Sequence, residues 1–253
     1  MKWLIVIIFS AFLNSSVYAQ EMHYSVAQNV PLLTYKNELR LSVATGTETY
    51  GIQVAYAFSK SLAVTGSYSN GLDFGDGSGN SGDVYFSGFR SSGELALGYF
   101  KEFKDSTIIE IYGGLERYHG DFEPWSSKQA GTLPSDTVRT NCTEPFVQFD
   151  LGFKNNGHHS FSLSCKFGYL IYDHFYTYHI EPYGGPQTTK NQESTSLNIV
   201  PCITYRLGGR RLSFQAQAGL STAPAVSYYD TGGDFFLNVG LSLRLFGEKK
   251  TPN

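Results

Sequence analysis

The chain has little of what a helical membrane protein or a nucleic-acid-binding protein needs. Beyond its first residues it holds no apolar run near the roughly 20 residues that a membrane-crossing helix takes. Charged residues make up 16% of the 253 positions and the net charge is −3, which argues against nucleic acid as a partner. The three cysteines, Cys142, Cys165 and Cys202, show no C-x-x-C spacing. Neither a disulfide framework nor a metal site is therefore predicted, and we expect no cofactor.

The one long apolar run lies at the N-terminus. It follows Lys2, starts at Trp3 and continues to Leu13, and Val17-Tyr18-Ala19 then supplies the small-residue pattern of a cleavage site. We predict a cleaved signal peptide over residues 1–19 and an exported protein. Membrane residence would then have to come from strands.

Aromatic residues (15%) and 27 glycines are abundant, and the apolar residues alternate with polar ones. The last stretch, 234–246, is the clearest case: its apolar side carries Leu237, Val239, Leu241, Leu243 and Leu245, and its other side carries small or polar residues and Arg244. A tilted strand crosses a bilayer in about 9–11 residues. Lipid on the apolar side and a polar lumen on the other would explain the alternation.

The same alternation recurs along the chain. Ten segments show it: 38–45, 50–58, 62–69, 94–103, 107–118, 145–154, 160–172, 195–207, 212–221 and 234–246. In the eighth, Pro201 removes a backbone donor and predicts a bulge. We predict an all-β protein, a transmembrane antiparallel up-and-down β-barrel of about ten strands, with eight or twelve as alternatives. The barrel would span residues 37–246, after a periplasmic lead-in over 20–36 and before a tail over 247–253.

The connections between these segments alternate in length, except that the first, Gly46–Thr49, is short on the side of the long ones. Short turns follow the second, fourth, sixth and eighth segments, and Asn-Gly at 156–157 is a strong hairpin turn. Long connections cover residues 70–92, 119–143, 173–193 and 222–233. Outer-membrane barrels have short periplasmic turns and longer extracellular loops. An even strand number would place both termini at the end with the short turns.

Alternation alone does not decide whether the apolar stripe faces lipid or a soluble core. The polar stripe is mostly Ser, Gly, Gln, Asn and Ala, which suits a crowded lumen better than a solvated surface. Aromatic residues lie toward the ends of the apolar stripe, as in interfacial girdles: Tyr50, Phe58, Tyr99, Phe153 and Tyr205. Both features favour the membrane barrel, and a secreted soluble ligand-binding barrel is the alternative.

With these features the chain resembles the small outer-membrane β-barrel proteins of Gram-negative bacteria, a porin-like, OmpA- or OmpW-like group. The resemblance rests on Val17-Tyr18-Ala19, Asn29-Val30-Pro31-Leu32-Leu33 and the final Leu241-Ser242-Leu243-Arg244-Leu245-Phe246. It implies the bacterial outer membrane as location, and outer-membrane lipid and the barrel-assembly machinery as partners. That machinery would recognise the aromatic Phe246, although residues 247–253 extend past it. Many unrelated functions share this fold.

Alternation also points a set of charged residues into the lumen. The set is Arg40, Glu94, Glu110, Glu116, Asp150, Lys154, Lys166, Arg206 and Arg244. Nearly balanced charges predict a salt-bridged plug, because an unpaired buried ion is costly. A narrow polar conduit is the competing interpretation.

Acid and histidine residues lie near the predicted strand ends at the long-loop side. Asp173-His174, His119 and Asp121 are placed as in an omptin protease, but a second acidic pair is missing at a strand end. An omptin-like or lipid-modifying activity is therefore left open, and we predict no catalytic residue.

The predicted loops carry two further features. Asp76-Gly-Ser78-Gly-Asn80 resembles the start of a calcium loop, yet Ser81 and Ser87 stand where Gly and Glu are required, which favours a plain surface loop. Loop aromatics could form an extracellular ligand surface or pack as a lid: Phe122, Trp125, Tyr176, Tyr178, Tyr183, Tyr228 and Tyr229.

We therefore predict a non-enzymatic outer-membrane barrel with a structural or surface-interaction role through its long loops. A narrow channel for small polar solutes is the alternative, and the secreted soluble barrel comes third. The sequence indicates no substrate.

Overall fold

A computed structural model describes residues 27–46, 49–71, 85–103, 106–125, 137–155, 158–179, 187–191, 195–209, 211–221 and 234–246. Its regular elements are strands: β1 Leu39–Gly46, β2 Thr49–Tyr56, β3 Leu62–Gly71, β4 Tyr85–Glu102, β5 Thr107–Trp125, β6 Thr137–Asn155, β7 His159–His179, β8 Gln187–Asn191, β9 Thr195–Gly208, β10 Leu212–Ser221 and β11 Asp234–Phe246. In this part of the chain no helix has the length and apolarity to cross a membrane.

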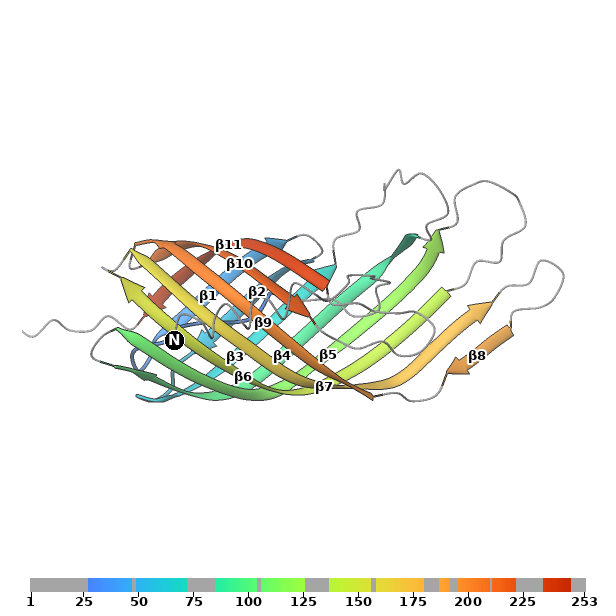
Figure 1. Ribbon diagram of the computed structural model, residues 1–253, viewed down its shortest axis with the longest axis horizontal. Helices are drawn as coiled ribbons and strands as arrows, with labels where there is room; N and C mark the ends of the chain where they lie inside the picture. The colour runs from blue at the N-terminus through green and yellow to red at the C-terminus, as the bar shows by residue number, and fades with distance from the viewer. Residues whose placement is uncertain are drawn as a thin grey trace, which may run out of the picture.

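Ten of the strands close into one antiparallel barrel (Figure 1). Each strand pairs with the next along the chain, β7 pairs with β9, and β1 pairs with β11 to complete the ring. The short β8 extends the sheet from the far end of β7. The predicted ten-stranded up-and-down barrel is confirmed.

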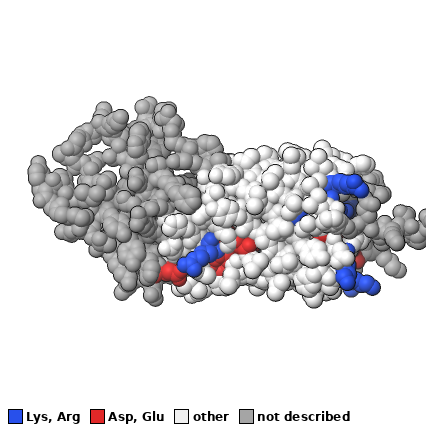
Figure 2. Space-filling view, turned by 180° about the vertical axis from the view of Figure 1, so that it is seen from behind, with Lys and Arg blue, Asp and Glu red and all other residues white. Residues whose placement is uncertain are grey.

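The apolar stripe faces outward. Leu95 and Leu97 on β4 are 65% and 64% exposed, and Ile52 on β2 is 59% exposed, while neighbours such as Ala96 and Gln53 are buried. Most of the face in Figure 2 lacks charged residues, which gather at one end and in a short run beside the grey region. A continuous apolar exterior of this kind is solvated by lipid, not water. The predicted girdle residues, among them Tyr50 and Phe153, lie on this exterior.

The connections alternate as predicted. The barrel strands meet in short connections after β2, β4, β6 and β9, which defines the turn end. Apart from the short β1–β2 connection, the opposite end carries the longer ones and is called the loop end.

Four strands are longer than the sequence predicts. β4, β5, β6 and β7 have 18, 19, 19 and 21 residues, and their extra residues were predicted as loops. These four strands extend past the ends of β1 and β2 (Figure 1). Outside the lipid a strand needs no apolar outer face, so the pairing can continue without the apolar alternation that marks a membrane strand. Cys142 is consequently part of β6 and not of a loop.

The bulge predicted at Pro201 is absent from the described ladders. Pro201 lies opposite Cys165 of β7 without a register shift, and the ladder between β9 and β10 ends next to it, at Cys202 and Gly219. A proline where one ladder has already ended needs no bulge to accommodate its missing N–H.

Candidate functional site

The lumen of the barrel is occupied by the chain's own residues 27–33, called here the lumen segment. Its apolar residues Val30, Leu32 and Leu33 are 0%, 1% and 0% exposed. The segment belongs to the stretch predicted as a periplasmic lead-in, but it lies inside the barrel. It then leaves the lumen at the turn end, where residues 34–38 lead into β1.

Wall side chains accept the backbone N–H groups of the lumen segment. The Glu110 carboxylate takes two consecutive ones, from Leu32 (2.9 Å) and Leu33 (2.6 Å). Gln217 accepts from the N–H of Gln28 (2.8 Å) and also donates to its carbonyl (3.1 Å). Such a paired contact imitates a neighbouring β-strand.

Other wall side chains donate to the carbonyl groups of the segment. Gln53 donates to Ala27 (2.7 Å), Gln148 to Asn29 (3.0 Å) and Arg40 to Leu32 (3.0 Å). Arg206 donates to the carbonyl of Val30. Buried backbone groups are costly unless paired, so the polar lumen replaces the water or the strand that they would otherwise need.

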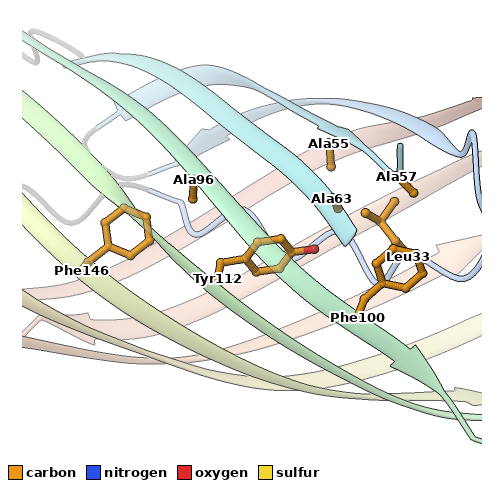
Figure 3. Packing of buried hydrophobic residues seen from close by; sticks show 8 residues of the cluster. All are labelled: Leu33, Ala55, Ala57, Ala63, Ala96, Phe100, Tyr112 and Phe146. Atoms are coloured by element: carbon orange, nitrogen blue, oxygen red, sulfur yellow. The ribbon is translucent and has the colours of Figure 1, made fainter. Parts of the chain in front are cut away.

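The apolar side chains of the segment fit recesses in the wall. Leu33 packs with Phe100 against the alanines of β2 and β3 (Figure 3). Leu32 has a left-handed backbone conformation (φ 51°), which is unfavourable for a bulky residue and lets its N–H and that of Leu33 reach the same carboxylate. Gly152 leaves room for the Leu32 side chain: a Cβ at that position would lie 3.2 Å from Leu32 Cγ and closer still to the two methyl groups.

A charged cluster ties the end of the segment to the barrel seam. Glu38 contacts Arg40 (2.8 Å) and Arg244 of β11 (3.0 Å), and accepts the N–H of Thr34 (2.8 Å). Burial would raise the pKa of Glu38, but the two arginines outweigh it and lower the pKa from 4.5 to about 2. Glu38 therefore stays ionised at neutral pH and holds together β1, β11 and the lumen segment.

A second charged cluster surrounds Lys166, farther from the turn end. Lys166 Nζ lies 3.1 Å from Glu94 and also contacts Glu116, and it sits over the ring of Phe146. Glu144 completes the cluster by accepting from Tyr118 (2.7 Å) and Asn198 (3.0 Å). All three carboxylates and the ammonium group are buried.

The remaining predicted lumen charges lie at inward positions too. Asp150 accepts from Gln148 (3.0 Å), and Arg206 donates to Gln215 (3.3 Å). Lys154 is half-buried near the turn end. Glu144, Glu38 and the glutamines of the wall were not in the predicted set. Glu144 directly precedes Pro145, which resembles a strand start, and the glutamines belong to the predicted polar stripe but carry no charge.

Of the residues considered for catalysis, the structure describes the side chains of Asp173 and His119, and each contacts a different residue. Asp173 pairs with Arg117 (3.6 Å) and His119 bonds Asn141 (2.7 Å), on outward faces of β5, β6 and β7. The side chains of Asp121, His174 and the predicted loop aromatics fall outside the described residues, as do the candidate calcium loop, the signal peptide and the tail. The backbone places Phe122 and Trp125 in β5 and Tyr176 and Tyr178 in β7, so these four aromatics belong to strands and not to loops. Within the described residues no group of three His, Cys, Asp or Glu could hold a metal. Phe246 ends β11 and is 62% exposed.

No family model and no curated protein matches the sequence. Solved structures do resemble the fold. The outer membrane protease OmpT from Escherichia coli shares 7% identity at a TM-score of 0.56, covering 82% of this chain and 93% of that one. A major outer membrane protein from Thermus thermophilus shares 15% identity at a TM-score of 0.38, and the match covers 82% of this chain and 99% of that one. The KdgM porin shares 7% identity at a TM-score of 0.39, and the match covers 83% of this chain and 99% of that one.

The likeness to OmpT establishes a common fold and carries no information on activity at this identity. The chain thus has the fold of the outer-membrane β-barrels, as the sequence resemblance predicts.

Proposed function

We propose that this protein is a non-enzymatic barrel of the bacterial outer membrane that acts at the cell surface rather than as a channel. The observation that carries the proposal is the length of β4 to β7. A strand crosses the membrane in about 9–11 residues, whereas these four have 18 to 21. The surplus forms a sheet that projects from the loop end, which is the extracellular end in barrels with this sorting of connections.

The filled lumen supports the same proposal. The lumen segment and the two charged clusters occupy positions that a conduit would have to leave open, and their side chains are buried. A structural or binding role for the projecting sheet, toward a ligand or a neighbouring molecule outside the cell, accords with both features.

The test combines surface exposure with conductance. An epitope tag inserted between residues 130 and 131 should be accessible to antibody on intact cells, and the same tag at 156–157, in a turn, should need permeabilised cells. Full-length protein reconstituted in planar bilayers should show no steady open channel. Accessibility of the turn tag alone, or a uniform conductance from most inserted molecules, would contradict the proposal.

A further inference from the structure

We propose that the lumen is a binding site for an uncharged, proline-containing peptide, and that residues 27–33 are its intramolecular occupant. The lumen segment makes no strand pairing with the wall. Every contact described above is one that a wall side chain makes with a peptide backbone or an apolar side chain. A separate peptide of the same sequence could make each of them. The proposal rests on the closed lumen of the proposed function and specifies what closes it.

The wall recognises backbone at both ends of the segment. Gln217 holds the N–H and carbonyl of Gln28, and Glu110 holds two N–H groups at the other end. The Gln28 side chain adds a donor contact to Val200 O (2.5 Å) and accepts from Ser164 (2.7 Å). Asn29 donates to the carbonyls of Val54 (3.0 Å) and Gly66 (3.2 Å). These paired contacts fix the direction of the peptide as well as its register.

Selectivity follows from what lies between these ends. Pro31 is buried and has no N–H that would need an acceptor. Its neighbours Val30 and Leu32 pack together with Ile108 of β5. A charged side chain at any of these buried positions would lose its hydration, which is costly. The site therefore favours a neutral peptide with a proline between two aliphatic residues.

The segment is joined to the barrel through residues 34–38, and Lys36 and Asn37 in that link are exposed. The link keeps the segment at a high effective concentration near the lumen. Cutting the link after folding leaves the contacts of the segment unchanged and removes that advantage, so cutting separates binding from covalent attachment.

The experiment uses the folded full-length protein with a protease recognition sequence inserted between Lys36 and Asn37. After cleavage in detergent, the N-terminal fragment should co-elute with the barrel on gel filtration. A fluorescent synthetic peptide of residues 27–33, Ala-Gln-Asn-Val-Pro-Leu-Leu, should then replace it, measured by anisotropy. A peptide with the same residues in reverse order should not.

Wall variants tie the exchange to the described contacts. Glu110→Gln removes a charged acceptor and should speed fragment release about tenfold to a hundredfold. This is the fold-change in affinity expected when hydrogen bonds to a charged group are lost. Gln217→Leu should also speed fragment release, and it replaces Glu110→Gln in the experiment if that variant does not fold. Ser42→Ala is the matched control, because Ser42 faces the lumen and bonds Ser242.

Four results would overturn the proposal, and the first three concern the fragment, the reversed peptide and the variants. They are separation of the fragment from a barrel that stays folded, equal exchange of the reversed peptide, and equal release rates in the wall variants and the Ser42→Ala control. Failure of any exchange in the faster-releasing variants would overturn it as well. These readouts measure peptide binding, so they are independent of the surface exposure and conductance that test the proposed function.

Discussion

At the scale of single residues, Lys166 is the lumen cation whose loss should cost most. It compensates Glu94 and Glu116, which are buried with it. Lys166→Met should lower the free energy of unfolding by about 3–5 kcal/mol, since removing one partner leaves buried carboxylates uncompensated. Urea unfolding in detergent micelles, followed by circular dichroism, measures the change.

Lys101→Met is the control for this substitution. Lys101 is exposed and lies over the ring of Phe103, 5.0 Å from its centroid. Its loss should change stability by no more than about 0.5 kcal/mol, the usual range at the surface. Equal effects of the two substitutions would mean that Lys166 is solvated rather than buried.

Gly152 tests the fit of the lumen segment. In Gly152→Ala the new methyl group meets Leu32, and the overpacking should destabilise the protein by about 1–3 kcal/mol. Gly93→Ala is the matched control, because an added Cβ there has no neighbour within 4 Å. Thermal unfolding of the two variants compares them. A Gly152→Ala protein as stable as Gly93→Ala would show that Leu32 does not occupy this recess.

Alternation assigns a side chain to the inner or outer face of the barrel, but it gives neither the position of that side chain along the barrel axis nor its contact partner. It therefore points Glu94 and Lys166 inward from the sequence, whereas their contact depends on the stagger of β4 against β7 across the barrel. Glu144 shows the other limit. Pro145 resembles a strand start. Glu144 therefore falls outside the predicted strand and receives no inward assignment from the sequence.

At the scale of elements, β11 offers a test of the membrane-facing side. Leu241 lies midway along the strand and Leu245 near its turn end, both exposed on the outer face. Leu241→Arg should cost about 2–4 kcal/mol and Leu245→Arg about 0–1 kcal/mol, because the cost of arginine facing lipid depends on depth. Folding into lipid vesicles, measured by equilibrium urea titration, compares them. Similar costs at both depths would exclude a bilayer around this face.

The membrane-crossing part of each strand was predictable because lipid imposes the alternation. The residues of β4 to β7 nearest the loop end were not predictable, because a strand that does not face lipid needs no apolar alternation. β8 was missed for the same reason. Residues 29–33 of the lumen segment carry part of the resemblance to outer-membrane barrels, yet the short apolar run around Pro31 has no periodicity that assigns it to a wall or to an interior.

At the scale of the whole molecule, the architecture follows from two regularities that the sequence shows directly. Alternating strands predict the barrel, and the sorting of short and long connections predicts which ends lie together. The pairing of β1 with β11 completes what those regularities require. The same regularities do not predict what fills the barrel, because the filling depends on one non-repeating segment that contacts several strands at once.

The placement of residues 27–33 inside the lumen is the feature on which both proposals depend. Hydrogen exchange in nanodiscs, read by mass spectrometry, tests it most directly at the amides of Leu32 and Leu33, whose N–H groups Glu110 accepts. These two amides should exchange as slowly as the strand amides around Tyr112. Exchange within seconds at Leu32 and Leu33, with the strands still protected, would contradict that placement.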